Sequence, residues 1–562
     1  DDVRESTGAT PAVLKTLLSK QVITEQMHKE EIPPTKIPDI VRPKLTEDQN
    51  KALSEITSST KPALLFGVTN SGKTEIYAQL ITDCILQGKQ AILLVPEILL
   101  TEHIIMRFTK LLPKDSIAII HSRLTPAQRK KTWRDIHQGK IHLVIGSRSA
   151  LFAPCRNLGV VIIDEEHEWT YKNEQTPRYH ARDAAEALCL FSGARLVLGT
   201  ATPSLESWER SKRGIYTLVR LSKRYNDHPY PDVRIIDLST VKFGDAYPFS
   251  TPLMHAIEKR LEKKEQTVLF LNRRGIGSAM LCLDCKRRIV SPDSQLPFTV
   301  HRSPTGKDCL IDHTTNTVID VPDACPHCQS NRLFTVGAGT QRIEDILSSR
   351  FPTARVIRAD KDTMSHPDQM RELLRTMLDG EADILLGTQS VVKGLDLPNV
   401  TLAAVLLADV GLSLPHFRAG ERIFQLLTQL TGRSGRAKPG EVIIQTFRPA
   451  APEIAYAAAH GTEQFLEAEL ALRIHAGYPP ASNMVRIIFR GIGSKTRAEE
   501  MAIHARRVNQ STGDNHVIGC APTLFGGGRI WHVLLRGSNP RDILMKLDTS
   551  DAVVDIDPMD CL

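Results

Sequence analysis

The first residues suited to chemistry lie in a glycine-rich segment that follows an apolar run. Residues 67–74, GVTNSGKT, fit the pattern G-x-x-x-x-G-K-[ST], and residues 63–66 before them are ALLF. In such a segment, backbone N–H groups hold phosphate oxygens, the Lys reaches the outer phosphates and the Thr hydroxyl binds Mg²⁺. The segment therefore predicts a nucleotide-phosphate and Mg²⁺ site formed by Gly67, Thr69, Ser71, Gly72, Lys73 and Thr74.

A phosphate-binding loop needs an acidic partner at the end of another buried strand. Residues 160–167, VVIIDEEH, supply one, because four apolar residues precede Asp164 and Glu165. We expect Asp164 to hold the Mg²⁺ and Glu165 to polarise the attacking water. An isolated Asp after a strand is more often a helix cap, but the upstream phosphate loop favours the catalytic interpretation.

Other apolar runs also end in small or hydroxyl residues, at 146–149 (GSRS) and 199–202 (GTAT). Ligands of open α/β sheets bind at the carboxyl ends of the strands, so these ends suit phosphates of a nucleotide or of a nucleic acid. Gln49, in KLTEDQNKAL, is a candidate adenine contact. A lone glutamine of this kind is more often an ordinary surface residue.

The second half of the chain repeats the strand-and-loop plan without a phosphate loop. Residues 267–271 form an apolar run before NRRG, and QLTGRSGR at 429–436 carries Arg433 and Arg436. Two arginines three residues apart on a helix lie near one face. They fit arginine fingers that reach the γ-phosphate of a nucleotide held by Lys73. Such a finger contributes about 10³–10⁵ to the rate of hydrolysis. The alternative is a solvated basic helix face.

The whole set of segments resembles superfamily 2 helicases, and more closely the PriA family of replication-restart helicases. The resemblance rests on GVTNSGKTE, LVPEILLT, GSRSALF, DEEH, GTATPS, FLNRRG, KGLDLPNV and QLTGRSGR, and it runs from about Lys44 to the C-terminus. It implies two RecA-like domains that bind ATP and Mg²⁺ between them, with Gln429 among the nucleotide contacts. It also implies 3′–5′ movement on DNA and a role in reloading the replication machinery. Asn70 replaces the usual glycine at a free position of the loop, so ATP binding is not put in doubt.

The resemblance marks the segment after DEEH as an aromatic-rich loop that senses single-stranded DNA. Aromatic faces among basic residues suit base stacking. A packed loop with surface aromatics is the alternative. The DNA contacts implied for this chain are Arg148, Trp169, Tyr171, Arg178, Tyr179, Thr202, Arg274 and Thr388, with Lys172 and His180 in the same loop.

Two Cys-x-x-Cys pairs, Cys282/Cys285 and Cys325/Cys328, have the spacing of zinc knuckles, and two such pairs close a tetrahedral site. Four reduced cysteines without a metal are the alternative. The PriA family has two further pairs between them for a second zinc. Here those positions are Ser291, Ser294, Cys309 and Asp312, with His313 adjacent. Serine hydroxyls are poor Zn²⁺ ligands, and the number and softness of the remaining Cys, Asp and His argue against a second metal. We therefore expect one Zn²⁺ in this segment. The basic residues 286–288, KRR, either contact the phosphate backbone of a nucleic acid or are a solvated run of charge.

We divide the chain into six parts: 1–35, a remnant of a winged-helix domain; 36–43, a linker; 44–225, the first RecA-like domain; 226–450, the second, with a zinc-binding insertion at 281–331; 451–482, a helical connector; and 483–562, an α/β C-terminal domain. The fold class predicted is therefore α/β multidomain. The family's N-terminal domain that captures 3′ ends has no counterpart in this sequence. Gly526–Gly528, with Arg529 and Trp531, favour a hairpin turn over a binding loop.

Composition limits the remaining choices. The 562 residues are 41% hydrophobic and 24% charged, with a net charge of +7 that suits either a polyanionic partner or a well-solvated surface. No apolar run is long enough for a membrane span, no signal peptide is evident, and ten scattered cysteines suit a reducing cytoplasm. We expect a monomer that binds single-stranded and forked DNA, single-stranded DNA-binding protein and primosome or helicase-loading proteins. A translocase without strand separation and a non-catalytic primosome scaffold are the alternatives.

Overall fold

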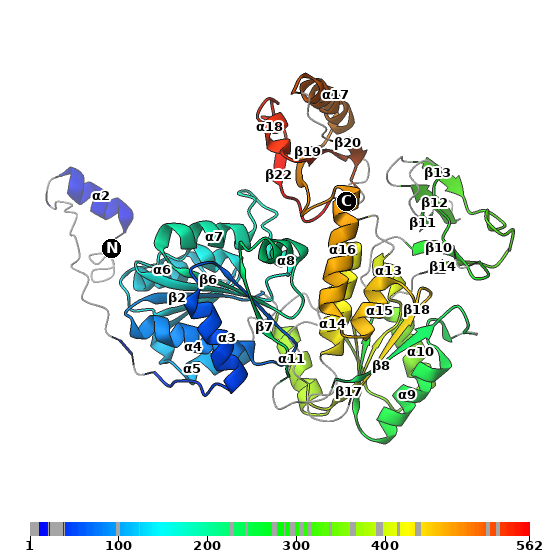
Figure 1. The fold of residues 1–562 in the computed structure, drawn as a ribbon, viewed down its shortest axis with the longest axis horizontal. Helices are drawn as coiled ribbons and strands as arrows, with labels where there is room; N and C mark the ends of the chain where they lie inside the picture. The colour runs from blue at the N-terminus through cyan, green and yellow to red at the C-terminus, as the bar shows by residue number, and fades with distance from the viewer. Residues whose placement is uncertain are drawn as a thin grey trace.

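The fold is described from a computed structural model, drawn in Figure 1. It describes residues 10–20, 22, 37–38, 40–96, 102–122, 124–224, 230–241, 246–271, 278–285, 287–292, 298–302, 308–312, 317–336, 340–359, 367–388, 397–412, 416–432, 440–512, 517–523 and 529–561. One N-terminal helix, α2 (Pro11–Ser19), precedes the first large domain, with Thr10 as its N-cap. Apart from residues 10–20 and 22, the winged-helix remnant predicted at 1–35 lies outside the described residues.

The first large domain is built on a sheet of seven parallel strands in the order β3-β4-β2-β5-β6-β1-β7. Most of its strands are apolar along their whole length because helices cover both faces of the sheet. The predicted strands at 63–66 and 160–163 overlap β1 and β5. The strands are β1 (Ala63–Gly67), β2 (Gln90–Leu94), β3 (Ile117–Ile120), β4 (Leu143–Gly146), β5 (Leu158–Asp164), β6 (Arg195–Thr200) and β7 (Thr217–Leu221).

Helices between these strands carry clear start signals in their sequences. Thr46 with Gln49 and Thr125 with Gln128 form reciprocal capping boxes, in which each side chain bonds the backbone of the other residue. The helices are α3 (Glu47–Ser58), α4 (Lys73–Leu86), α5 (Glu102–Thr109), α6 (Pro126–His137), α7 (Ala181–Ser192) and α8 (Leu205–Lys212). Short 3₁₀ turns lie at Lys114–Ser116, Arg148–Phe152 and Trp169–Tyr171.

The second large domain has six parallel strands in the order β15-β16-β9-β17-β18-β8. The strands are β8 (Asp232–Asp237), β9 (Gln266–Phe270), β15 (Val356–Ala359), β16 (Ile384–Gly387), β17 (Val400–Val405) and β18 (Glu441–Thr446). The helices are α9 (Thr251–Glu262), α10 (Thr340–Arg350), α11 (Pro367–Leu378), α13 (Asp409–Leu412) and α14 (Ala419–Thr431). Two parallel α/β sheets confirm the predicted fold class.

An antiparallel sheet, β13-β12-β11-β10-β14, interrupts the second domain and projects away from the first domain in Figure 1. Its strands are β10 (Ser278–Cys282), β11 (Thr299–Arg302), β12 (Asp308–Asp312), β13 (Thr317–Asp320) and β14 (Leu333–Val336). The sheet extends past both ends of the predicted insertion, 281–331, because β10 and β14 pair with each other.

The helical connector predicted at 451–482 contains two helices, α15 (Pro452–Ala458) and α16 (Thr462–Ala476). The break follows from His460, whose φ is 56°, and from the glycine after it. In Figure 1, α16 runs along the junction of the two large domains. A C-terminal module follows, with the sheet β20-β21-β19-β22. It contains β19 (Asn483–Arg490), α17 (Ser494–Thr512), β20 (Val517–Pro522), β21 (Ile530–Gly537), α18 (Pro540–Leu544) and β22 (Val553–Ile556).

Within the part of the chain that the structure describes, no helix combines the length and apolar character that crossing a bilayer requires.

Candidate functional site at the junction of the two sheet domains

The phosphate-loop segment connects β1 to α4 at the carboxyl edge of the first sheet. Gly72 is the N-cap of α4 and has a φ of 80°, where a side chain would also collide with the amide of Gln49. Lys73 Nζ donates to the Gly67 carbonyl over 2.8 Å, so its ammonium group stays inside the loop. The geometry is that of a backbone cradle with one cation at its centre, which suits phosphate oxygens.

Gln49 holds the phosphate loop through hydrogen bonds to its backbone. It is only 2% exposed, accepts from the Thr46 N–H over 2.9 Å, and directs Nε2 toward the Ser71 and Gly72 carbonyls at 3.4 Å. The alternative of an ordinary surface glutamine is therefore wrong. The adenine contact stays a prediction.

The acidic segment after β5 lies next to the loop. Tyr77 donates its hydroxyl to Asp164 Oδ1 over 2.9 Å, and Tyr171 donates to the Asp164 carbonyl over 2.7 Å. A side chain at Gly199 would collide with the Tyr77 hydroxyl, which explains the glycine at that position. Burial, followed by the charge of Glu165, raises the pKa of Asp164 to about 6, while Lys73 and the Tyr77 hydrogen bond oppose the rise. A half-buried carboxylate next to a phosphate cradle fits a divalent cation with oxygen ligands.

Glu165 has two features of a strained functional residue. Its φ is 47°, a region that costs a non-glycine residue about 1–3 kcal/mol and is frequent at active sites. Its Oε2 is buried with no hydrogen-bond partner and lies 3.7 Å from His167 Nδ1. A carboxylate oxygen without a hydrogen-bond partner can accept a hydrogen bond from a water molecule.

His167 connects the acidic segment to both domains. Its Nδ1 lies 2.7 Å from Thr200 Oγ1 at the end of β6, and its Nε2 lies 2.8 Å from the side-chain nitrogen of Gln429 on α14. Thr200 Oγ1 also accepts from the Thr202 N–H over 3.0 Å. Gln429, predicted as a nucleotide contact, therefore pairs with His167 in this structure.

The second domain also touches the phosphate loop itself. A side chain at Gly432 would collide with the Thr69 side chain, so the end of α14 lies directly against the loop. Arg433 and Arg436, the predicted fingers, lie outside the described residues, as does Arg274. The contact at Gly432 is the last described point of the chain before Arg433.

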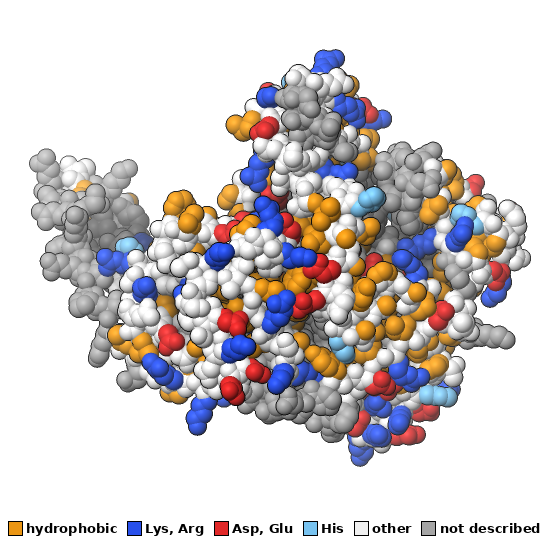
Figure 2. Space-filling model, in the orientation of Figure 1, with side chains coloured by type: hydrophobic (Ala, Val, Ile, Leu, Met, Phe, Trp, Pro, Cys, Tyr) orange, Lys and Arg blue, Asp and Glu red, His pale blue; other side chains and the backbone are white. Residues whose placement is uncertain are grey.

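Buried charges that the sequence analysis missed join the domains. Arg418 pairs with Glu206 at 2.6 Å, Arg473 pairs with Glu421 at 2.7 Å, and Glu421 accepts from the Leu205 N–H over 3.1 Å. Burial raises the pKa of Glu206, but Arg418 and Arg182 more than compensate and hold it well below its ordinary value. The surface ion pairs Arg220–Glu463 and Lys212–Glu467 also join the first domain to α16. Figure 2 shows acidic and basic side chains intermixed along this junction. No sequence motif identifies these pairs, because their partners are more than fifty residues apart.

An apolar contact reinforces the same junction. The rings of Phe66 on β1 and Trp208 on α8 meet edge to face with centroids 6.2 Å apart. Both belong to one buried cluster with Phe424 and Leu427 of α14. The two sheets therefore share part of a core, so movement of one domain changes packing in the other.

Predicted DNA contacts fall into exposed and buried groups. Trp169 is 44% exposed, Tyr179 is half-buried edge to face with Phe152, and Arg148 is half-buried and donates to the Thr170 carbonyl over 2.6 Å. Thr388 is half-buried at the end of β16. These four remain candidate DNA contacts.

Tyr171 and Thr202 differ from the prediction, since each is only 1% exposed. A buried ring has no free face for a base, and the Thr202 side chain lies against His167. Both support the site from inside the domain. Arg178 is mostly buried and pairs with Asp555 of the C-terminal module at 3.5 Å.

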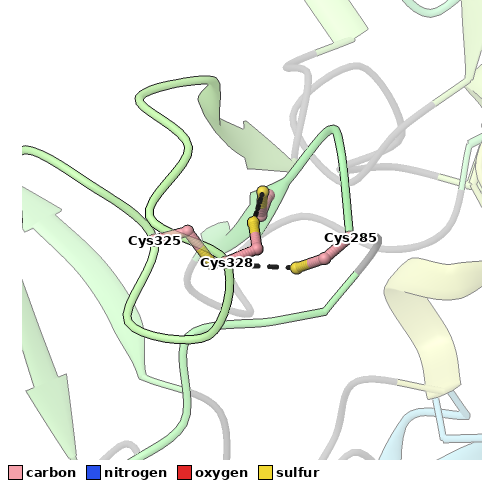
Figure 3. A group of neighbouring side chains, drawn as sticks. Cys285, Cys325 and Cys328 are labelled. Atoms are coloured by element: carbon pink, nitrogen blue, oxygen red, sulfur yellow. Dashed lines mark hydrogen bonds between the residues drawn. The ribbon is translucent and has the colours of Figure 1, made fainter.

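The four cysteines of the two Cys-x-x-Cys pairs come together in the insertion. Their sulfur atoms all lie within 4.8 Å of one another, with Cys282–Cys328 at 3.6 Å and Cys285–Cys325 at 3.7 Å. Figure 3 shows the sulfurs of both pairs facing one another. Four thiolates around Zn²⁺ at about 2.3 Å are separated by about 3.8 Å, so the cluster fits a tetrahedral metal. Among the described residues it is the one group that offers such a set.

Three of the four positions where the PriA family has cysteines for a second zinc are among the described residues: Ser291, Cys309 and Asp312. Ser291 is fully buried and Asp312 is 2% exposed, so both are part of the core of the insertion. Ser294 and His313 lie outside the described residues.

A cationic hollow at α6 was also missed by the sequence analysis. Leu124, Pro126, Arg129, Lys130 and Trp133 surround a surface hollow of about 420 Å³, and Trp133 is 41% exposed. An aromatic side chain among cations suits a nucleic acid. The run of basic residues in QRKKTWR could have revealed it.

Comparison with known proteins agrees with this geometry. A family model described as DEAD/DEAH box helicase matches residues 46–211. The Replication restart protein PriA of Bacillus subtilis is 42% identical over 85% of this chain and 60% of its own length, and that of Rickettsia conorii is 38% identical over 83% and 71%. The solved structure of RecG bound to a three-way DNA junction covers 77% of this chain and 50% of its own at 17% identity, with a TM-score of 0.45. The chain thus spans about 60% of the length of the Bacillus subtilis relative. Identity at this level across both sheet domains shows that the chain belongs to the PriA family of replication restart proteins.

Proposed function

We propose that this chain is an ATP-dependent 3′–5′ DNA helicase that unwinds DNA at stalled or abandoned replication forks and initiates primosome assembly. One observation carries the catalytic part: the phosphate loop and α14 of the second domain touch at Thr69 and Gly432. A nucleotide in the loop therefore lies next to the segment that continues to Arg433. In a site formed by both domains, nucleotide binding is coupled to closure of the domains.

Each catalytic side chain has a defined task. Lys73 leaves the Gly67 carbonyl to bind the outer phosphates. Thr74 and Asp164 would hold Mg²⁺, which would supply positive charge to the phosphates. Glu165 orients the attacking water with its unpaired Oε2. Arg433 and Arg436 complete the charge stabilisation from the second domain. Together these groups position the phosphates and stabilise the charge of the transition state.

Hydrolysis is coupled to DNA through the elements that leave the same sheet edges. His167 connects Glu165 to Thr200 and to Gln429, so a change at the γ-phosphate reaches both domains. DNA runs over Arg148, Trp169, Tyr179 and Thr388, with Arg178 and Arg274 as further phosphate contacts. The proposed direction of movement and preference for forks rest on the likeness to the PriA family.

The cysteine cluster holds one Zn²⁺, which fixes the fold of the insertion. The insertion serves strand separation and the binding of partner proteins. Single-stranded DNA-binding protein and helicase-loading proteins are the partners, and the active form is a cytoplasmic monomer. These assignments rest on the likeness to the PriA relatives, which are named replication restart proteins.

Two assays on the same preparation test the proposal. ATP hydrolysis is measured with and without single-stranded DNA, and strand displacement is measured on a forked duplex, both beside Lys73→Ala. DNA-stimulated hydrolysis with displacement, both lost in Lys73→Ala, supports the helicase. Stimulated hydrolysis without displacement indicates a translocase. Equal, negligible hydrolysis in both proteins indicates a scaffold.

A further inference from the structure

Residues 168–180, here called the sensor loop, are held at both ends. At the first end, Tyr171 donates its hydroxyl to the carbonyl of Asp164, the predicted Mg²⁺ ligand, over 2.7 Å. Lys172 and His180 pair as an antiparallel bridge, and Asn173 N–H donates to the Tyr179 carbonyl over 2.7 Å. The loop is therefore a closed unit, and a movement of its tip reaches Asp164 through Tyr171.

The loop is also attached to the C-terminal module, through the Asp555 carboxylate and two backbone carbonyls. Asp555 on β22 pairs with Lys172 Nζ at 2.9 Å and with Arg178 Nη1 at 3.5 Å. Lys172 also donates to the carbonyls of Ile556 at 2.6 Å and Asp557 at 3.2 Å. These contacts join residues almost four hundred positions apart in the chain.

Burial makes this attachment strong and specific. The side chains of Lys172, Asp555 and Arg178 are 2%, 4% and 11% exposed. A charge removed from water in this way needs its partner, and loss of one partner leaves the other unpaired at a high cost. Two cations share one carboxylate, so the group has an excess of positive charge that a second anion would reduce.

A phosphodiester has the same chemical character as the Asp555 carboxylate. Each is a monoanion with oxygens that accept from a guanidinium and an ammonium group, and Arg and Lys bind both classes of anion. Trp169, exposed on the same loop, offers a ring on which the adjoining base can stack. A phosphate can therefore take the place of the Asp555 carboxylate at these two cations.

We propose that Asp555 stands in for a DNA phosphate and holds the sensor loop in its DNA-free position. Single-stranded DNA exchanges a phosphodiester for the carboxylate at Lys172 and Arg178, which frees the loop from β22. The release shifts Tyr171 and the Asp164 backbone, and so raises the rate of ATP hydrolysis. This inference rests on the proposed DNA-stimulated ATPase and adds the switch that controls it.

The test compares Asp555→Asn with wild type in the full chain. ATP hydrolysis is measured without DNA, and affinity for an oligo-dT single strand is measured by fluorescence anisotropy. Asp555→Asn keeps the shape of the side chain and removes its charge, so we expect DNA-free hydrolysis to rise about fivefold or more and the oligo-dT affinity to increase. A change that merely damaged the fold would lower both.

Asp557→Asn is the matched control. Asp557 lies two residues further on, but its side chain pairs with Arg541 inside the C-terminal module at 3.0 Å. We expect its DNA-free rate and affinity to equal those of wild type. Asp555→Glu, which retains the charge, should also remain close to wild type.

Lys172→Met separates the switch from DNA binding. It breaks the attachment, so DNA-free hydrolysis rises, but it removes a phosphate contact, so oligo-dT affinity falls. Unchanged DNA-free rates in Asp555→Asn overturn the inference when wild type is stimulated by oligo-dT. If Asp555→Asn does not fold, an unchanged rate in Lys172→Met overturns it. A wild type that hydrolyses ATP at one rate with and without DNA instead overturns the proposed function itself.

Discussion

The side-chain nitrogen of Gln429 lies 2.8 Å from Nε2 of His167, in a buried contact that joins α14 to the DEEH segment. With Gln429 as donor, His167 Nε2 accepts, and the ring proton is on Nδ1, 2.7 Å from Thr200 Oγ1. The contact thus fixes the tautomer of a histidine that lies 3.7 Å from Glu165. Contact between the two domains and orientation of the Glu165 carboxylate are linked through one imidazole.

Gln429→Leu tests this link. The change keeps the volume but leaves His167 Nε2 buried without a donor, at a cost of about 1–3 kcal/mol. We expect DNA-stimulated kcat to fall roughly tenfold to a hundredfold, since ~1.4 kcal/mol corresponds to a factor of ten. Steady-state ATPase assays measure it. Gln425→Leu, one turn earlier on α14 and paired with Glu421 at 3.3 Å, is the control, and an equal loss in both variants would contradict the link.

A second prediction concerns pH. The pKa of Asp164 is raised to about 6 by burial and by Glu165, so this carboxyl takes up a proton at a higher pH than an ordinary Asp. Protonation removes the charge that binds Mg²⁺. We therefore expect kcat/KM for Mg·ATP to decline as the pH falls through about 6, and added Mg²⁺ to move the decline to lower pH because metal and proton compete. A profile that is flat down to pH 5 would contradict this.

Tyr77→Phe provides the check on the assignment. The Tyr77 hydroxyl donates to Asp164 Oδ1 and stabilises its charged form. Removal of this donor raises the pKa of Asp164 further, so the acidic decline should move to higher pH. A decline that stays in place would assign the titration to another group.

The arginines after Gly432 give a third prediction. If Arg433 and Arg436 reach the γ-phosphate, alanine at either position lowers kcat by about 10³–10⁵, with a much smaller effect on nucleotide affinity. Single-turnover hydrolysis and binding of a fluorescent nucleotide separate the two effects. Arg375→Ala on α11 removes an exposed arginine whose ion pair, among the described residues, is with Asp379, so it should have wild-type kinetics. Wild-type kcat in Arg433→Ala and Arg436→Ala would assign them to a solvated helix face.

Much of the two sheet domains could be predicted from the sequence because the sequence patterns that identify them are local. The apolar runs around Ala63–Phe66 and Val160–Ile163 are long enough to identify buried strands, and the glycine pattern at 67–74 identifies the loop between them. The Cys-x-x-Cys spacing likewise predicted the cluster that the structure brings together. Each of these signals lies within one short segment or depends on ligand chemistry.

Contacts between distant segments could not be predicted in the same way. Nothing near Lys172 in the sequence indicates Asp555, and nothing near Arg418 indicates Glu206. The sequence predicts Tyr171 as a DNA contact, whereas its ring is buried against Asp164 and the core of the first sheet. Burial of this kind is set by tertiary packing rather than by local sequence.

A fourth prediction concerns metal content. Purified protein should contain about one zinc per chain, bound by four thiolates. Cys282→Ser should lower the zinc content and the thermal stability of the insertion, whereas Cys309→Ser should change neither, since Cys309 is outside the cluster. Inductively coupled plasma mass spectrometry measures the metal. About two zincs per chain, or none, would contradict the assignment.

Strand displacement on a forked DNA with a labelled strand tests the central claim most directly. The account predicts ATP-dependent release of the strand by wild type and no release by Lys73→Ala, with single-stranded DNA raising ATP hydrolysis in wild type alone. Failure of wild type to separate the fork while it hydrolyses ATP in response to DNA would contradict the helicase assignment.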